Sequence, residues 1–184
     1  MNGSLLVILT VLTVALCAIP ATERQGFLNA HNMLRSKISS GNYVAKGKKM
    51  PAAKTPIPSL VWDTAIENSA QQWANGCQFK HSQKKGFGEN LYTKWFSAPL
   101  TMTGVGKEAS NSWENEFQQY GWKDIKLTAD VFNSGIGHAT QMAWAKTTKI
   151  GCGIALCQGN KQVLVVCQYQ AQGNMLNTNV YEPK

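Results

Sequence analysis

Three histidines are the side chains of this sequence best suited to acid–base or metal chemistry. A neutral imidazole transfers protons near neutral pH and binds divalent metals. His81 precedes Glu89 by eight residues, His138 follows a Gly-Ile-Gly sequence at the head of a predicted helix, and Glu116 projects from another predicted helix. Two imidazoles and two carboxylates could form a site for zinc or another divalent cation, or an acid–base cluster. Spacing alone does not establish such a site, because no local motif such as H-E-x-x-H links these residues.

The third histidine, His31, has a different setting. It recurs with Phe27, Leu34 and Ile38 on one face of a helical pattern that ends near Gly41. A lone histidine on an apolar helix face is usually a core residue whose ring nitrogens are hydrogen-bonded. We therefore predict a structural role for His31.

Common catalytic motifs are missing from the sequence. There is no G-x-S-x-G nucleophile motif. The phosphate-loop pattern also fails, because it needs glycine where Thr101 stands and serine or threonine where Glu108 stands. One enzymatic alternative remains, a metal-dependent hydrolase in which Glu89 or Glu116 acts as general base on a metal-bound water.

The N-terminal region predicts export. Residues 5–19 form an apolar run that is too short to cross a hydrocarbon core of about 30 Å comfortably, and small residues near its end offer cleavage sites. We therefore predict a signal peptide over residues 1–18 and a secreted mature chain over residues 19–184. No other segment of the sequence predicts a membrane span.

Cysteine usage agrees with that compartment. Of the five cysteines, Cys17 falls in the predicted signal peptide. The even number that remains predicts two disulfides, with three pairings open, and a zinc site of four thiolates is the alternative. The remaining four are Cys77, Cys152, Cys157 and Cys167.

Composition limits the class of protein. Of the 184 residues, 43% are hydrophobic and 15% are charged, which predicts one folded domain rather than a disordered chain. The 18 Lys and Arg against 10 Asp and Glu give a net charge of +8, which favours encounters with polyanions or anionic membranes. Polyanion binding is thus a further alternative, although a solvated basic loop explains the same charges. No aromatic residues alternate with the lysines, so no nucleic-acid partner is predicted. The lysines concerned are Lys46, Lys48, Lys49, Lys54, Lys84 and Lys85.

Helical and extended patterns alternate irregularly along the chain. Beyond the first helix, helical patterns cover residues 64–77, 105–120 and 134–145, and residues 64–67 match a capping box. Strand patterns cover residues 89–93, 150–156 and 162–169, and the short turn between the last two predicts an antiparallel hairpin. Because no βαβ unit repeats, the predicted fold class is α+β with a small antiparallel sheet.

Four segments, taken together, resemble a known family. In chain order they are His-Asn-Met-Leu-Arg at 31–35, Gly-Glu-Asn-Leu at 88–91, Gly-His-Ala-Thr-Gln-Met-Ala-Trp at 137–144 and Val-Val-Cys-Gln-Tyr-Gln-Ala-Gln-Gly-Asn at 165–174. They resemble the motifs of the CAP superfamily, which comprises cysteine-rich secretory proteins, antigen 5 allergens and plant pathogenesis-related proteins. Residues 79–83 are most similar to nematode activation-associated secreted or venom-allergen-like proteins.

The resemblance implies a fold and a site. It implies a single CAP domain over residues 19–184, with an α-β-α sandwich in which a three-stranded antiparallel sheet lies between helical layers. It also implies the disulfides Cys77–Cys157 and Cys152–Cys167, and a tetrad that lines a cleft and can hold zinc or another divalent cation. The tetrad consists of His81, Glu89, Glu116 and His138.

The function implied by the resemblance is that of a secreted, non-enzymatic binding or effector protein. Its partners would be a protein receptor, from a host or from the same organism, or a sterol or fatty acid held in an apolar groove. The metal-dependent hydrolase and the polyanion-binding protein remain as alternatives.

Overall fold

The computed structural model describes residues 19–184, so the predicted signal peptide lies outside the described residues. Within the described part of the chain, no helix combines the length and the apolar character that a bilayer crossing needs. In chain order the elements are α1 (Ala21–Ser39), β1 (Val44–Ala45), β2 (Lys48–Lys49), β3 (Val61–Trp62), α2 (Thr64–Ala74), β4 (Gly88–Trp95), α3 (Val105–Glu114), α4 (Glu116–Gln119), α5 (Ala129–Phe132), α6 (Gly137–Ala143), β5 (Lys149–Cys157) and β6 (Gln162–Gln170).

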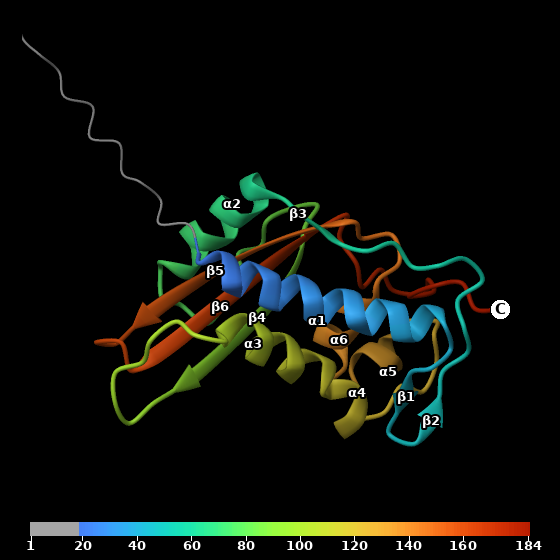
Figure 1. The fold of residues 1–184 in the computed structure, drawn as a ribbon. Helices are drawn as coiled ribbons and strands as arrows, with labels where there is room; N and C mark the ends of the chain where they lie inside the picture. Colours follow the sequence, from blue (N-terminus) through green and yellow to red (C-terminus); the bar gives the residue numbers. More distant parts are fainter. Residues whose placement is uncertain (1–18) are drawn as a thin grey trace, which may run out of the picture.

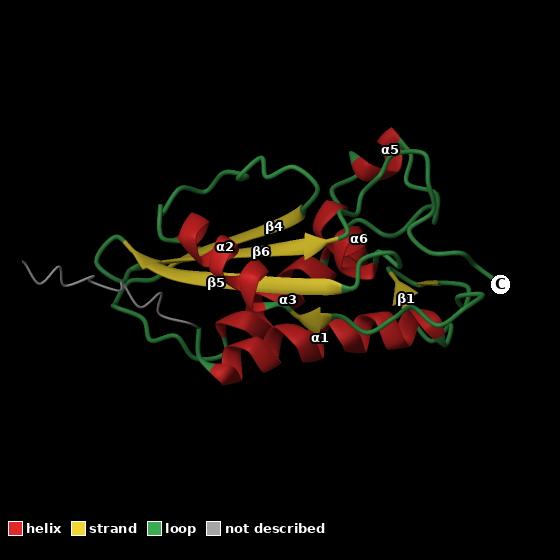
Figure 2. Ribbon diagram, turned by 90° about the horizontal axis from the view of Figure 1, so that it is seen from above, coloured by secondary structure: helices red, strands yellow, loops and turns green. Residues whose placement is uncertain are grey.

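A four-stranded sheet with the order β3-β5-β6-β4 lies at the centre of the fold (Figure 2). The three long strands, β4, β5 and β6, form the predicted antiparallel sheet, and the predicted hairpin joins β5 to β6. The structure adds a short strand at one edge, because Val61 and Trp62 pair in parallel with the start of β5. This fourth strand has only two residues, too few to produce a recognisable alternating pattern.

Helices cover both faces of the sheet (Figure 1). The α2 helix packs on one face, against β5 and β6, while α1, α3 and α6 pack together over the other face. Along β6, Val163 and Val165 face the larger core, whereas Leu164 and Val166 face α2. This alternation follows from the pleat of a strand, which points successive side chains to opposite faces. The predicted α-β-α sandwich is therefore confirmed.

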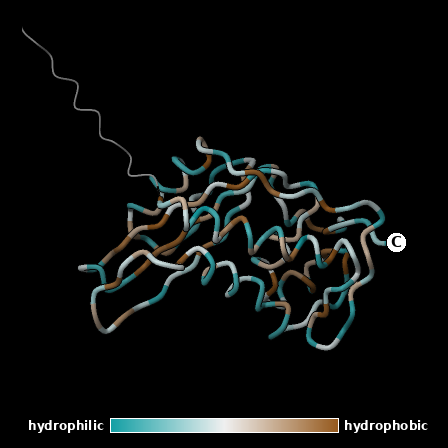
Figure 3. The backbone as a smooth tube through the Cα atoms, viewed as in Figure 1, coloured by the Kyte–Doolittle hydropathy of each residue, from teal (hydrophilic) through white to brown (hydrophobic). Residues whose placement is uncertain are grey.

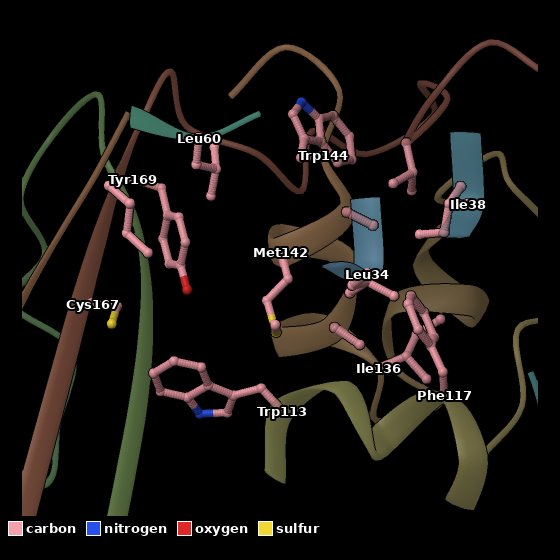
Figure 4. Close-up of a cluster of buried hydrophobic side chains, with 14 of the residues drawn as sticks. Leu34, Ile38, Leu60, Trp113, Phe117, Ile136, Met142, Trp144, Cys167 and Tyr169 are labelled. Carbon is pink, nitrogen blue, oxygen red and sulfur yellow. The ribbon is translucent and has the colours of Figure 1, made fainter. Parts of the chain in front are cut away.

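The larger core gathers side chains from distant parts of the chain. Figure 4 shows Leu34 of α1, Trp113 of α3, Met142 of α6 and Tyr169 of β6 converging on one interior region, and all four are buried. In Figure 3, hydrophobic stretches run along the central strands. Burial of these surfaces is the main favourable contribution to folding, worth about 25 cal/mol for each Å² of apolar surface removed from water.

His31 is part of this core, as predicted. Its side chain is buried, with Nδ1 2.8 Å from the carbonyl oxygen of Phe27 and Nε2 2.9 Å from the hydroxyl oxygen of Tyr169. Burial lowers the pKa of His31 to about 4, so the ring is neutral at pH 7. A neutral imidazole with both nitrogens hydrogen-bonded has a structural role.

Arg35 is the other polar residue of α1 inside the core. Its guanidinium donates to four backbone carbonyls, those of Pro58 at 2.7 Å, Met142 at 3.0 Å, Trp144 at 2.9 Å and Thr147 at 2.7 Å. Two of these carbonyls follow the end of α6, where they have no partner within a helix. Arg35 therefore ties α1 to the segment that leads from α6 into β5.

One predicted helix is interrupted and another is shorter than expected. The helical pattern predicted over 105–120 is confirmed except at Asn115, which separates α3 from α4 while keeping right-handed helical angles. After it, Phe117 stacks on Trp122 with ring centroids 4.2 Å apart. The helix predicted over 134–145 begins only at Gly137, because Gly135 has φ +94°, a left-handed conformation that no right-handed helix contains.

The predicted capping box at the start of α2 is also wrong. Asp63 caps the helix instead, because its carboxylate accepts hydrogen bonds from the N–H groups of Ala65 at 3.0 Å and Ile66 at 3.1 Å. Glu67 is buried and does not reach back to the helix start.

Two disulfides link the β5–β6 hairpin to the rest of the fold and to itself. Cys77 follows α2 and pairs with Cys157 at the end of β5, while Cys152 and Cys167 are direct neighbours on β5 and β6. The pairing implied by the family resemblance is present. The alternative of four thiolates around zinc is wrong for these residues, since each sulfur is bonded to another sulfur.

Candidate functional site: a cleft with two histidine–glutamate pairs

The four residues of the predicted tetrad line one cleft of about 270 Å³. They come from four separate elements: His81 from the loop after α2, Glu89 from β4, Glu116 from the start of α4 and His138 from α6. Asn174, which follows β6, also lines this cleft. The structure thus brings together residues that lie up to 57 positions apart in the sequence, from His81 to His138.

His81 and Glu89 form the first pair. His81 Nδ1 lies 3.0 Å from Glu89 Oε1, and the same carboxylate accepts hydrogen bonds from the backbone N–H and hydroxyl of Ser82 and from the side-chain amide of Gln168. The bond to Glu89 raises the pKa of His81 above its usual 6.5, against the effect of partial burial. Burial alone would raise the pKa of Glu89, but its hydrogen-bond donors outweigh burial and lower it.

His138 and Glu116 form the second pair. His138 Nδ1 lies 2.5 Å from Glu116 Oε1, and Oε2 accepts from the backbone N–H groups of His138 at 2.9 Å and Ala139 at 3.0 Å. Glu116 therefore satisfies N–H groups at the start of α6, which have no partner within the helix. The His138 ring also stacks on Trp113, with centroids 6.1 Å apart. Glu116 occupies the first position of α4.

Both pairs are held by the framework around them. The side chain of Asn90 on β4 donates to the carbonyl of His138 at 3.1 Å, which links the strand that carries Glu89 to α6. A Cβ atom at Gly88 would collide with the side-chain amide of Gln141, which also accepts from the N–H of Gly173 at 2.9 Å. The segments 88–91, 137–144 and 165–174 are therefore in direct contact around the cleft.

Comparison with known proteins fits this geometry. The model of the cysteine-rich secretory protein family, CAP, matches residues 28–169. The chain belongs to the CAP family. That match covers all four cleft residues and both disulfides.

Among curated relatives of this CAP protein, venom allergen 3 of Solenopsis invicta is 34% identical, covering 88% of the chain and 73% of the relative. A secreted protein of Ancylostoma caninum is 35% identical, covering 86% of the chain and 38% of the relative. Among solved structures, BmVAL-1 has a TM-score of 0.85 and 39% identity, covering 90% of the chain and 84% of the neighbour. NaASP2, solved with Zn²⁺, has a TM-score of 0.85 and 35% identity, covering 91% and 89%. The chain is therefore a venom-allergen-like member of the family.

The donor atoms in the cleft are arranged as two pairs and not as a closed set of four ligands. Within residues 19–184, no three His, Cys, Asp or Glu side chains are grouped closely enough to hold a metal ion. Each histidine uses Nδ1 toward its glutamate, and neither Nε2 has a hydrogen-bond partner in the described residues. The carboxylate oxygens of Glu89 and Glu116 are occupied by hydrogen-bond donors.

Two side chains that hold the site, Ser82 and Gln168, lie in segments that carry the family resemblance but were not among the predicted site residues. Ser82 and Gln168 hold the Glu89 carboxylate, and Gln168 does so because it pairs with Glu89 across β4 and β6. A polar pocket of about 430 Å³ adjoins the cleft, shares His81 and Glu89 with it, and is lined by the loop that carries Lys85. Only an antiparallel register, set over the whole strand, brings Gln168 to this position.

The basic loop predicted between residues 46 and 58 is partly structural. Lys46 Nζ donates to the carbonyl of Gln119 at 2.8 Å, and Lys48 Nζ donates to those of Trp122 at 3.3 Å and Lys123 at 2.6 Å. These two ammonium groups satisfy carbonyls at and beyond the end of α4. The charge of this loop therefore has a role that involves no polyanion.

Proposed function

We propose that this CAP protein is a secreted, non-enzymatic binding protein whose cleft binds a divalent cation through the Nε2 atoms of His81 and His138. The observation that carries the proposal is that each histidine donates Nδ1–H to a glutamate and leaves Nε2 without a partner, in one cleft. Metal-binding histidines commonly donate their second ring N–H to a carboxylate, which fixes the tautomer and orients the ring. The donor set therefore suits zinc or a similar cation.

The glutamates would act on the cation through the histidines. Their carboxylates hold the imidazole rings in place and make them more basic ligands. With two protein nitrogens as ligands, a bound cation would keep open positions, where it would supply a Lewis-acidic anchor for oxygen atoms of a partner. Direct ligation by all four residues, as first predicted, would compete with the hydrogen bonds that Glu89 and Glu116 accept from Nδ1 of His81 and His138.

The non-enzymatic part of the proposal rests on the same hydrogen bonds. A general base needs a carboxylate oxygen free to take a proton from substrate or water. Glu89 and Glu116 each accept three or more hydrogen bonds, and the four cysteines of residues 19–184 are all in disulfides. Secretion is supported by the relatives, which include venom allergens and a secreted protein.

Zinc titration of the metal-free protein tests the cation site. We expect His138→Ala to weaken zinc binding by about 100-fold, and Glu116→Gln to weaken it by about 10-fold, because loss of a carboxylate behind a ligating histidine typically costs 10–100-fold in affinity. The measurement is isothermal titration calorimetry of the secreted protein at pH 7.5.

Glu108→Gln is the matched control for the zinc titration. Glu108 lies on α3, is exposed and pairs with Lys94, so this variant should keep the full affinity. Zinc binding that is unchanged in His138→Ala would contradict the proposed site. Thermal unfolding of each variant distinguishes a lost ligand from a lost fold.

An apolar pocket supports a lipid cargo as a second candidate function. It has a volume of about 530 Å³ and lies where the start of α1 meets the end of α2 and the far half of β5. A fatty-acid chain or a sterol would find apolar walls there. Its lining residues are Ile19, Pro20, Gln71, Asn75, Cys77, Met102, Ile154, Ala155 and Leu156.

The lipid candidate predicts that extraction of the purified protein yields a sterol or fatty acid detectable by mass spectrometry. Leu156→Gln should weaken lipid binding by about 5-fold or more, because it places a polar group against the lipid at a cost of about 1–3 kcal/mol. Val61→Gln is the control, since Val61 is exposed and lies outside the pocket. Equal lipid content in both variants, or none in the native protein, would remove this candidate.

A further inference from the structure

Glu67 has an unusual environment for a helix residue. It lies on α2 and is 1% exposed, yet it takes no part in capping its own helix. Its Oε1 accepts from Arg24 Nη2 at 2.8 Å and from the backbone nitrogen of Ile19 at 3.3 Å, while Oε2 accepts from the indole of Trp62 at 2.7 Å. A buried carboxylate therefore gathers donors from the start of α1 and from β3.

The Ile19 nitrogen is available because of how α1 begins. The first hydrogen bonds of α1 run from the N–H groups of Glu23 and Arg24 to the carbonyl of Pro20, so the N–H of Ile19 has no role in the helix. The Ile19 side chain is itself buried, at 4% exposure. The backbone nitrogen of residue 19 is thus held inside the protein, against a negative charge.

Residue 19 is also the first residue of the predicted mature chain. We propose that removal of the leader converts the Ile19 nitrogen into a charged α-ammonium group that forms a buried ion pair with Glu67 and so locks the start of α1 onto α2. This inference rests on the predicted cleavage after residue 18 and is independent of the cation cleft.

The chemical change is hydrolysis of one amide by an endopeptidase that recognises small residues. Water adds to the Ala18 carbonyl carbon, the bond from that carbon to the Ile19 nitrogen breaks, and the nitrogen takes a proton. At neutral pH the Ala18 carboxylate leaves with the leader, and a second proton on the nitrogen makes the ammonium group. The acceptor, Glu67, is already in place in the uncut chain.

The expected gain in stability arises because the Ile19 nitrogen becomes charged while it stays beside Glu67. Before the cut, the Glu67 carboxylate already accepts a hydrogen bond from the neutral Ile19 N–H at 3.3 Å. The cut adds the attraction between two opposite charges, which is stronger in the protein interior than in water and, for a pair shielded from water, is screened little by salt. A free ammonium group at a helix N-terminus is otherwise unfavourable, because that end of the helix dipole is already positive. Arg24 adds a second cation, whose side chain is 32% exposed and thus partly solvated. The negative charge of Glu67 offsets the repulsion of the ammonium group by the helix dipole and by Arg24.

The first experiment identifies the mature N-terminus and measures the effect of its charge. Intact-mass analysis of protein secreted with its native leader should show a chain that begins at Ile19. A form that begins at Ala18 moves the ammonium away from Glu67 and leaves an amide in its place. Its melting temperature at pH 7 should be lower by about 3–6 °C.

Substitutions at Glu67 and elsewhere test whether the carboxylate causes that difference. In Glu67→Gln, the two forms should melt within about 1 °C of each other. In Glu182→Gln, the full difference should persist, because Glu182 is exposed and lies near the C-terminus, at the opposite end of the molecule from the start of α1 (Figure 1). In Arg24→Gln, which keeps the buried carboxylate, the difference should be at least as large as in the native chain.

Three results would overturn the inference. The first is a mature N-terminus at any residue other than Ile19, and the second is equal melting of the two native forms. The third is a difference that stays in full in Glu67→Gln. If that variant does not fold, Arg24→Gln decides, because loss of the difference there would contradict pairing with Glu67.

Discussion

Replacing Arg35 by methionine is expected to lower the free energy of unfolding by about 4 kcal/mol. The guanidinium is 1% exposed and donates to four carbonyls, and burial lowers its pKa only to about 10, so it is charged at pH 7. Methionine fills a similar volume but donates no hydrogen bond. Buried acceptors left without donors cost about 1–3 kcal/mol each, with partial relief where water enters.

Urea denaturation followed by fluorescence measures this change. Lys37→Met is the matched control, since Lys37 is exposed on the same helix, and it should change stability by less than about 0.5 kcal/mol. A destabilisation below about 1 kcal/mol in Arg35→Met would show that the four carbonyls find other donors. Because Arg35 anchors the chain after α6, which carries His138, the Arg35→Met variant should also bind zinc more weakly than Lys37→Met.

Removal of the Cys77–Cys157 disulfide is expected to cost about 4.5 kcal/mol, against about 3 kcal/mol for Cys152–Cys167. The sequence separations are 80 and 15 residues, and in the chain-entropy model a disulfide that closes a longer loop restricts the unfolded chain more. The comparison uses two double variants, Cys77→Ala/Cys157→Ala and Cys152→Ala/Cys167→Ala, each measured by thermal and urea unfolding.

The ranking of the two double variants is the informative outcome. Cys152 and Cys167 are fully buried between β5 and β6, whereas Cys77 lies in a partly exposed loop. If packing around the sulfur atoms dominated, loss of the buried pair would cost more, because truncation of buried side chains leaves cavities. Greater loss of stability in the Cys152/Cys167 variant would therefore contradict the loop-closure explanation.

Much of the secondary structure could be predicted from local pattern. The strands over 150–156 and 162–169 and the hairpin between them were recognisable from apolar and β-branched residues around a short polar turn, and they correspond to β5 and β6. The helices were overextended where a local feature interrupts a periodic pattern. Gly135 delays the start of one helix to Gly137 through its left-handed backbone, and Asn115 interrupts another between α3 and α4.

The role of Glu67 shows where local reasoning fails. Its position three residues after Thr64 matches a capping box, but its carboxylate bonds with Arg24 and Ile19, more than 40 residues earlier in the chain. The helix begins one residue earlier than the capping box requires, because Asp63 is the N-cap, so Glu67 lies four residues after the cap and not three. Here the donors that reach Glu67 include Ile19 and Arg24, which the local sequence around α2 does not contain.

The sequence by itself determined the types of residue in the cleft, the family, the strand order in the chain and the number of disulfides available, because motifs, periodicity and cysteine counts are local or additive properties. Only the tertiary structure decided that each cleft histidine pairs through Nδ1 with one glutamate, and that Gln168 holds Glu89 from the neighbouring strand. Hydrogen-bond partners are set by distances of about 3 Å between atoms on different elements. Such distances exist only once the helices and strands have packed.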